Sequence, residues 1–86
     1  DSKGMIASFE SIQEGLIKRG HQNYYNLVTC GYYLGLANYI EGNNQKALSH
    51  FEEALSYKLS PYVEKRAASK LESARNYRDK ILSETK

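Results

Sequence analysis

The stretch at residues 34–55, LGLANYIEGNNQKALSHFEEAL, places small residues where the interface of two helices usually holds large ones. Gly35 lies in an apolar run, Gly42 interrupts that run, and Ala47 and Phe51 then follow at helical spacing. In a helical hairpin that turns at Gly42, Gly35 and Ala47 fall at about the same height. Because two helices approach closely only where side chains are small, the pattern predicts a close crossing with Phe51 wedged between the helices.

Apolar spacing along the rest of the chain extends this hairpin into an all-α antiparallel bundle of about four helices, at residues 3–19, 24–41, 44–59 and 61–84. Each boundary has a recognisable signal. Glycine ends two of the helices, an asparagine caps the third, and serine followed by proline opens the fourth; these residues are Gly20, Gly42, Asn43 or Asn44, and Ser60-Pro61.

Length and composition bound the function. The 86 residues suffice for one small domain, and a net charge of +2 gives no reason to expect nucleic acid. The single cysteine, Cys30, is expected to pack as a small apolar group, since no histidine lies within sequence reach. His50 and Glu53 are three residues apart without a second such pair, and His21 lies in a predicted loop. The sequence therefore predicts no enzyme, metal, cofactor or small-molecule substrate.

The cellular setting is predicted only in outline. The chain begins with Asp1, which we interpret as the start of a piece from a longer protein. Its longest uncharged stretch, residues 23–40, holds three asparagines and is too polar for a good membrane span. We expect a cytoplasmic protein, with any membrane anchor in parts of the parent protein outside this chain.

The spacing of the hairpin residues resembles the tetratricopeptide repeat, whose period of about 34 residues holds Leu-Gly in one helix and Ala-x3-Phe in the next. Residues 28–61 match one repeat, through Leu34-Gly35, Gly42, Ala47-x3-Phe51 and Ala54-Leu55. Gly31 and Asn38 depart from it, because they stand where the family has aromatic residues. The resemblance implies that residues 62–84 form a capping helix and that the first helix belongs to a degenerate preceding repeat.

A narrower resemblance concerns YYLGLANY at 32–39 and QKAL at 45–48, which are similar to the mitochondrial fission adaptor family. That likeness implies a domain on the cytosolic face of an organelle membrane.

The family resemblance also implies a binding groove lined by the first helix of each repeat. Seven residues would form it: Tyr25, Tyr32, Leu36 and Tyr39 in one sector of the second helix, and Tyr62, Arg66 and Lys70 on a wall from the fourth. Some family members hold a peptide carboxylate with a polar clamp, but the corresponding positions here are Tyr32 and Leu36, which favours a more apolar ligand. The alternative is that the tyrosine stripe packs against the first or the fourth helix.

These patterns predict a non-catalytic protein-interaction module, an adaptor that binds a peptide or helix of a partner protein. Two alternatives stay open. The chain could be an oligomerisation or capping segment of a longer helical repeat, including a homo-oligomer. It could also be a microtubule-interacting-and-transport-like domain, whose last helix residues 66–82, RAASKLESARNYRDKIL, resemble.

Overall fold

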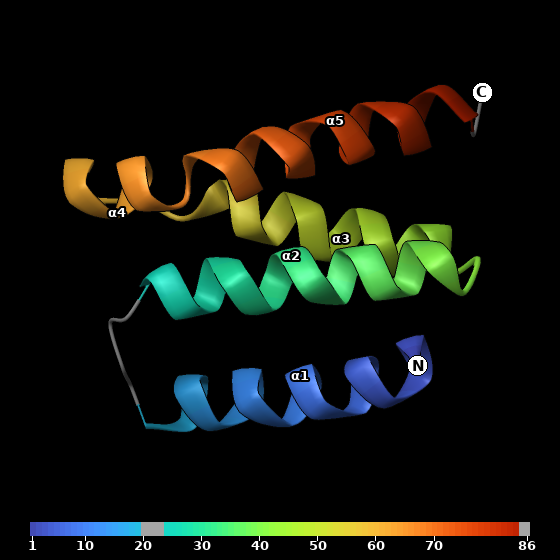
Figure 1. Ribbon diagram of the computed structural model, residues 1–86, viewed down its shortest axis with the longest axis horizontal. Helices are drawn as coiled ribbons and strands as arrows, with labels where there is room; N and C mark the ends of the chain where they lie inside the picture. The colour runs from blue at the N-terminus through green and yellow to red at the C-terminus, as the bar shows by residue number, and fades with distance from the viewer. Residues whose placement is uncertain (20–23, 85–86) are drawn as a thin grey trace.

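The computed structural model describes residues 1–19 and 24–84, which form five helices and no strand (Figure 1). The helices are α1 (Ser2–Lys18), α2 (Tyr24–Ile40), α3 (Asn44–Ser56), α4 (Pro61–Arg66) and α5 (Ala68–Glu84). The all-α prediction is confirmed, and the first two helices lie close to their predicted bounds. The predictions made for Gly20 and His21 lie outside the described residues.

The small residues of α2 allow close contact with side chains of α3. Phe51 of α3 lies against Gly35, where an added Cβ would come within 2.6 Å of the ring. One turn earlier on α2, a Cβ added to Gly31 would lie 3.1 Å from the Cβ of Ala54. Phe51 has no exposed surface. The predicted close crossing at Gly35 is present, but its nearest neighbour is Phe51, whereas the sequence had placed Ala47 opposite Gly35. Gly31 is a second point of close approach.

The turn between α2 and α3 is a Schellman motif centred on Gly42. This residue has φ of +81°, a conformation that favours glycine. The Asn43 amide donates to the carbonyl of Asn38 at 2.8 Å, and the Gly42 amide donates to that of Tyr39 at 3.1 Å. Asn43 precedes α3 as predicted, but its side chain bonds the Asn38 side chain at 3.2 Å and does not cap the helix.

The predicted end of the third helix at residue 59 is wrong, because α3 stops at Ser56. Tyr57 is extended, with φ of −70° and ψ of 137°. Tyr57 and Leu59 then pack onto a buried cluster that contains Val28 and Leu71. The packing of these two half-buried side chains from the non-helical connection replaces the last helical turn. Ser60 begins α4 as predicted, since its hydroxyl accepts the Val63 amide at 3.3 Å.

The predicted fourth helix is in fact two helices, α4 and α5, separated at Ala67. Ala67 has φ of −94° and ψ of 3°, and its carbonyl still accepts the Leu71 amide at 2.9 Å. The residue is completely buried and packs in the cluster with Val28. Its small side chain lets the backbone approach α2 at the point where the helix axis changes direction.

Helix α2 is the centre of the bundle. It packs against α1 on one side and against α3, α4 and α5 on the others, whereas α1 and α5, both described along their whole length, make no contact with each other. Figure 1 shows α1 and α5 on opposite sides of α2. One face of α2 is therefore left between α1 and α5, and this open face, called the α2 face below, is where the predicted groove would lie.

Candidate functional site

The tyrosine stripe predicted as a binding floor lies on the side of α2 that meets α5. Tyr25, Tyr32, Leu36 and Tyr39 are all half-buried. The Tyr32 hydroxyl is hydrogen-bonded to the Ser73 hydroxyl at 3.0 Å. The alternative interpretation is that the stripe packs against the C-terminal helix. This packing accounts for the direction in which the side chains of the stripe point.

The far end of the stripe shows the same arrangement. The Tyr39 hydroxyl donates to Glu84 at 3.2 Å, and its ring meets the ring of Tyr77 edge to face, with centroids 5.3 Å apart. The hydroxyl groups of the stripe are thus held by α5, while part of each side chain stays accessible. Binding of a partner by these residues stays a prediction.

Two of the three predicted wall residues, Arg66 and Lys70, lie near Tyr25. The Lys70 ammonium donates to the Tyr25 hydroxyl at 3.3 Å, and the Arg66 guanidinium lies 4.4 Å from the centre of its ring. The hydrogen bond from Lys70 lowers the pKa of the Tyr25 phenol, and the charges of Lys70 and Arg66 act in the same direction. Tyr62 is 68% exposed and lies beyond Arg66, 6.0 Å from its guanidinium. The structure brings Tyr25, Arg66 and Lys70 together and leaves Tyr62 at the edge.

Sequence reasoning missed Tyr33, which extends the aromatic surface to α1. Its ring stacks on Phe9 with centroids 5.3 Å apart and meets Tyr32 edge to face at 5.2 Å. Tyr33 lies one residue after Tyr32, about 100° around the helix, and so falls outside a stripe defined by helical spacing. Ile40, 65% exposed, lies near the end of the same helix. The α2 face thus joins aromatic side chains from α1 to α5.

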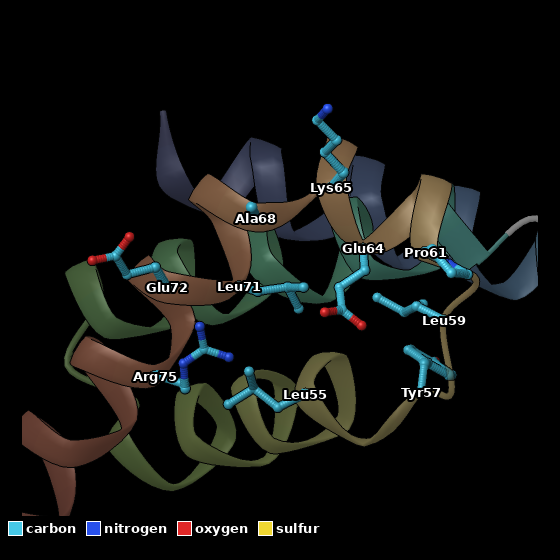
Figure 2. Close-up of a pocket in the computed structure, with 10 residues that line it drawn as sticks. All are labelled: Leu55, Tyr57, Leu59, Pro61, Glu64, Lys65, Ala68, Leu71, Glu72 and Arg75. Atoms are coloured by element: carbon cyan, nitrogen blue, oxygen red, sulfur yellow. The ribbon is translucent and has the colours of Figure 1, made fainter.

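A concave feature lies between the end of α3 and the α4–α5 segment (Figure 2). It is a cleft of about 630 Å³, and its apolar lining comes from Leu55, Tyr57, Leu59, Pro61, Ala68 and Leu71. The non-helical connection after α3 and the break at Ala67 shape the cleft, since both turn the chain away from a straight helix pair. The sequence did not predict this cleft, because neither irregularity was foreseen.

Four charged residues line the same cleft, and they fall into two pairs. The exposed side chains of Glu64 and Arg75 point toward the cleft, whereas the charged groups of Lys65 and Glu72 point away from it (Figure 2). In the part of the chain that the structure describes, the one ion pair joins Arg78 and Asp79, at 3.1 Å. Glu64 and Arg75 therefore face the cleft without an ion-pair partner among those residues.

Neither Cys30 nor His50 lines the cleft. Cys30 is 3% exposed among Leu16 and Leu27, and burial raises the pKa of its thiol, which works against thiolate chemistry. Burial lowers the pKa of His50, although the carboxylates of Glu53 and Glu10 oppose the shift. Within residues 1–19 and 24–84, no three potential ligands from histidine, cysteine or acidic residues come together as a metal site.

Comparison with protein-family models, with curated proteins and with solved structures gives no significant match. Among the described helices, none combines the length and apolar character needed to cross a membrane. The resemblance to the tetratricopeptide repeat accordingly depends on the residues themselves, above all on the spacing of Gly35, Gly42 and Phe51.

Proposed function

We propose that this chain is a non-catalytic protein-interaction module that binds a peptide or helix of a partner protein on its α2 face. The proposed contact surface consists of Tyr25, Tyr32, Tyr33, Leu36 and Tyr39, with Tyr62, Arg66 and Lys70 at its edge. The observation that supports it most is the set of accessible rings between α1 and α5, together with Ile40, which is 65% exposed on the same helix as Tyr32 and Tyr33. Apolar and aromatic surface of this kind is enriched where proteins bind one another.

The tyrosines suit recognition because they are held in place before a partner arrives. Tyr32 is fixed by Ser73, Tyr33 by Phe9 and Tyr39 by Glu84. A side chain that is already ordered loses little conformational entropy on binding, whereas a mobile side chain costs about 0.5–1.5 kcal/mol to immobilise. The rings offer a large contact area at a small entropic cost.

The test is a selection of random displayed peptides on the folded chain, followed by titration of the enriched peptide into variants. Tyr33→Ala and Ile40→Ser are each expected to weaken binding by about tenfold, since both remove contact area from the α2 face. Ile17→Ser is the matched control, because Ile17 is 61% exposed, like Ile40, but lies on α1. Backbone amide chemical shifts should move at Thr29 and Leu36 when the peptide binds.

A peptide whose affinity is the same for wild type, Ile40→Ser and Tyr33→Ala would overturn the assignment of this face. Circular dichroism of each free variant confirms that the helices persist, so that a loss of binding is not a loss of fold.

A further inference from the structure

Two positive charges converge on one ring at the edge of the α2 face. The Arg66 guanidinium carbon lies 4.4 Å from the centre of the Tyr25 ring, and the Lys70 ammonium lies 5.3 Å from that centre. The two charges are therefore less than about 10 Å apart, which is about one Debye length at 0.1 M salt. Lys70 is half-buried, so solvent screens its charge less than that of a fully exposed lysine.

No carboxylate of the described residues neutralises these two charges. Neither Arg66 nor Lys70 lies in an ion pair within that part of the chain. Helix α2 has no charged residue along its whole length, so the helix that both cations face cannot neutralise them. Glu64 and Glu72 are the nearest acidic residues in sequence, and neither lies within ion-pair distance of them. Both cations instead contact the ring or the hydroxyl of Tyr25.

The contacts with Tyr25 hold both cations and leave most of their hydrogen-bond donors available. A guanidinium over an aromatic ring keeps its N–H groups in its own plane, where they form a fork that matches a carboxylate. Lys70 donates one of its three N–H groups to the Tyr25 hydroxyl, at 3.3 Å, and the hydroxyl keeps its own hydrogen to donate. The donors of three side chains therefore lie around one point at the edge of the α2 face.

We propose that Arg66 and Lys70, together with Tyr25, bind an aspartate or glutamate side chain of the partner segment on the α2 face. The inference rests on the proposed function, and it adds the partner's chemical class and its direction. A carboxylate accepts two N–H groups of an arginine fork at once, and the second cation strengthens the same contact. The bound carboxylate also relieves the repulsion between the two positive charges.

The opposite end of the α2 face suits an acidic side chain less well. Lys80 lies 5.6 Å from the centre of the Tyr39 ring, but Glu84 is already there and accepts the Tyr39 hydroxyl at 3.2 Å. Glu41 follows the last residue of α2 at the same end. An acidic side chain placed there would meet two carboxylates, whereas at Tyr25 it meets two cations. The partner should therefore lie with its acidic end at Tyr25.

The unbroken helix α2 gives the spacing expected on the partner. Tyr25 and Tyr33 are eight residues apart on α2, which corresponds to about 12 Å along the helix axis. The acidic residue should therefore lie about 12 Å from the apolar residue that contacts Tyr33. This distance corresponds to about eight residues in a helical partner and about four in an extended one.

The probe is the tightest peptide selected from a random displayed library on the whole chain. It is synthesised with an amidated C-terminus, so that only side chains supply a carboxylate. We expect an aspartate or glutamate at one end of the selected consensus. Replacement of that residue by asparagine or glutamine should weaken binding to the wild-type chain about tenfold, measured by fluorescence anisotropy. The Arg66 Nε–Hε resonance should shift with the acidic peptide and not with the amide peptide.

A double-mutant cycle assigns the contact to the two cations. Arg66→Gln/Lys70→Gln should bind the acidic peptide about tenfold more weakly than wild type does, and should bind the acidic and amide peptides equally. Unchanged binding of the amide peptide excludes a folding defect. Lys58→Gln/Lys65→Gln is the matched control, because it removes two positive charges from exposed lysines of the α3–α4 connection and of α4. This control should change affinity by less than about twofold.

Two results would overturn the inference. One is a selected peptide that loses affinity in Tyr33→Ala and Ile40→Ser but carries no acidic residue, since the α2 face would then bind without this contact. The other is equal weakening of the acidic peptide by Lys58→Gln/Lys65→Gln, because the attraction would then depend on overall charge. Failure of the proposed function gives a different pattern, in which Tyr33→Ala and Ile40→Ser have no effect while the double-mutant cycle still shows coupling.

Discussion

Replacing Gly35 by alanine tests the packing on which the whole bundle depends. The new Cβ would lie 2.6–2.8 Å from three ring atoms of Phe51. A comfortable carbon–carbon contact is about 3.5–4.0 Å, so the overlap is about 1 Å. The ring cannot withdraw freely, because it has no exposed surface and stacks on Tyr77 with centroids 5.5 Å apart and planes 6° apart.

Two opposing effects determine how much Gly35→Ala changes the free energy of unfolding. An overpacked core costs about 1–3 kcal/mol, and the fixed ring places this site at the upper end, near 3 kcal/mol. Alanine in place of glycine inside a helix returns about 1 kcal/mol. We therefore expect Gly35→Ala to lower the free energy of unfolding by about 2 kcal/mol, a fall in melting temperature of about 8–16 °C for a domain of this size.

Gly15→Ala on α1 is the matched control for this change. Its added Cβ would meet only the Arg19 guanidinium, 3.7 Å away, at the end of an exposed and flexible side chain. Gly15→Ala should therefore show only the gain from replacing a helical glycine by alanine, a stabilisation of about 1 kcal/mol. Urea unfolding followed by circular dichroism measures both variants. Equal stability changes for Gly35→Ala and Gly15→Ala would refute the reasoning, since the clash would then have no energetic consequence.

Three further predictions concern single residues elsewhere in the bundle. Burial lowers the pKa of His50, so on acidification the unfolded chain binds this proton at a higher pH than the native chain, and stability should fall as the pH drops through about 6.5. The free energy of unfolding, measured at about pH 7.5 and about pH 5.5, should fall less in His50→Gln than in wild type. Cys30, buried and with a raised pKa, should react with a disulfide reagent slowly in the native chain and quickly in urea, and rapid native labelling would contradict its placement. Gly42→Ala should cost about 1 kcal/mol in urea unfolding because of the positive φ, and Gly42→Asn should cost less; equal stability of the two variants would argue against the left-handed turn.

Local signals in the sequence predicted much of the fold. Gly42 marked the turn, Ser60 marked the start of α4, and the small Gly35 indicated where α2 and α3 approach closely. Each of these depends on a residue whose backbone or side-chain preference is strong by itself. Composition and apolar spacing also reflect local preferences, and they were sufficient to predict the all-α class.

The features that the sequence did not predict depend on tertiary burial. Ala67 interrupts a helix with neither glycine nor proline nearby, and it is completely buried in the cluster that contains Val28 of α2. Leu59 continues a helical apolar pattern but packs from an extended connection. The cleft follows from both, and Tyr33 contributes through its stacking on Phe9, a residue distant in sequence. None of these partners can be read from local preference alone.

The two glycines of α2 also determine the register of the hairpin. The depression at Gly35 accommodates a phenyl ring, whereas the approach at Gly31, one turn away, leaves room only for the methyl group of Ala54. Sliding α3 by one turn would bring Phe51 to the site that admits only a methyl group. The correct alignment of the two helices is thus specified by their own surfaces, and the Gly42 turn is needed to join them but not to align them. Residues inserted at this turn should therefore lengthen the connection without shifting one helix along the other.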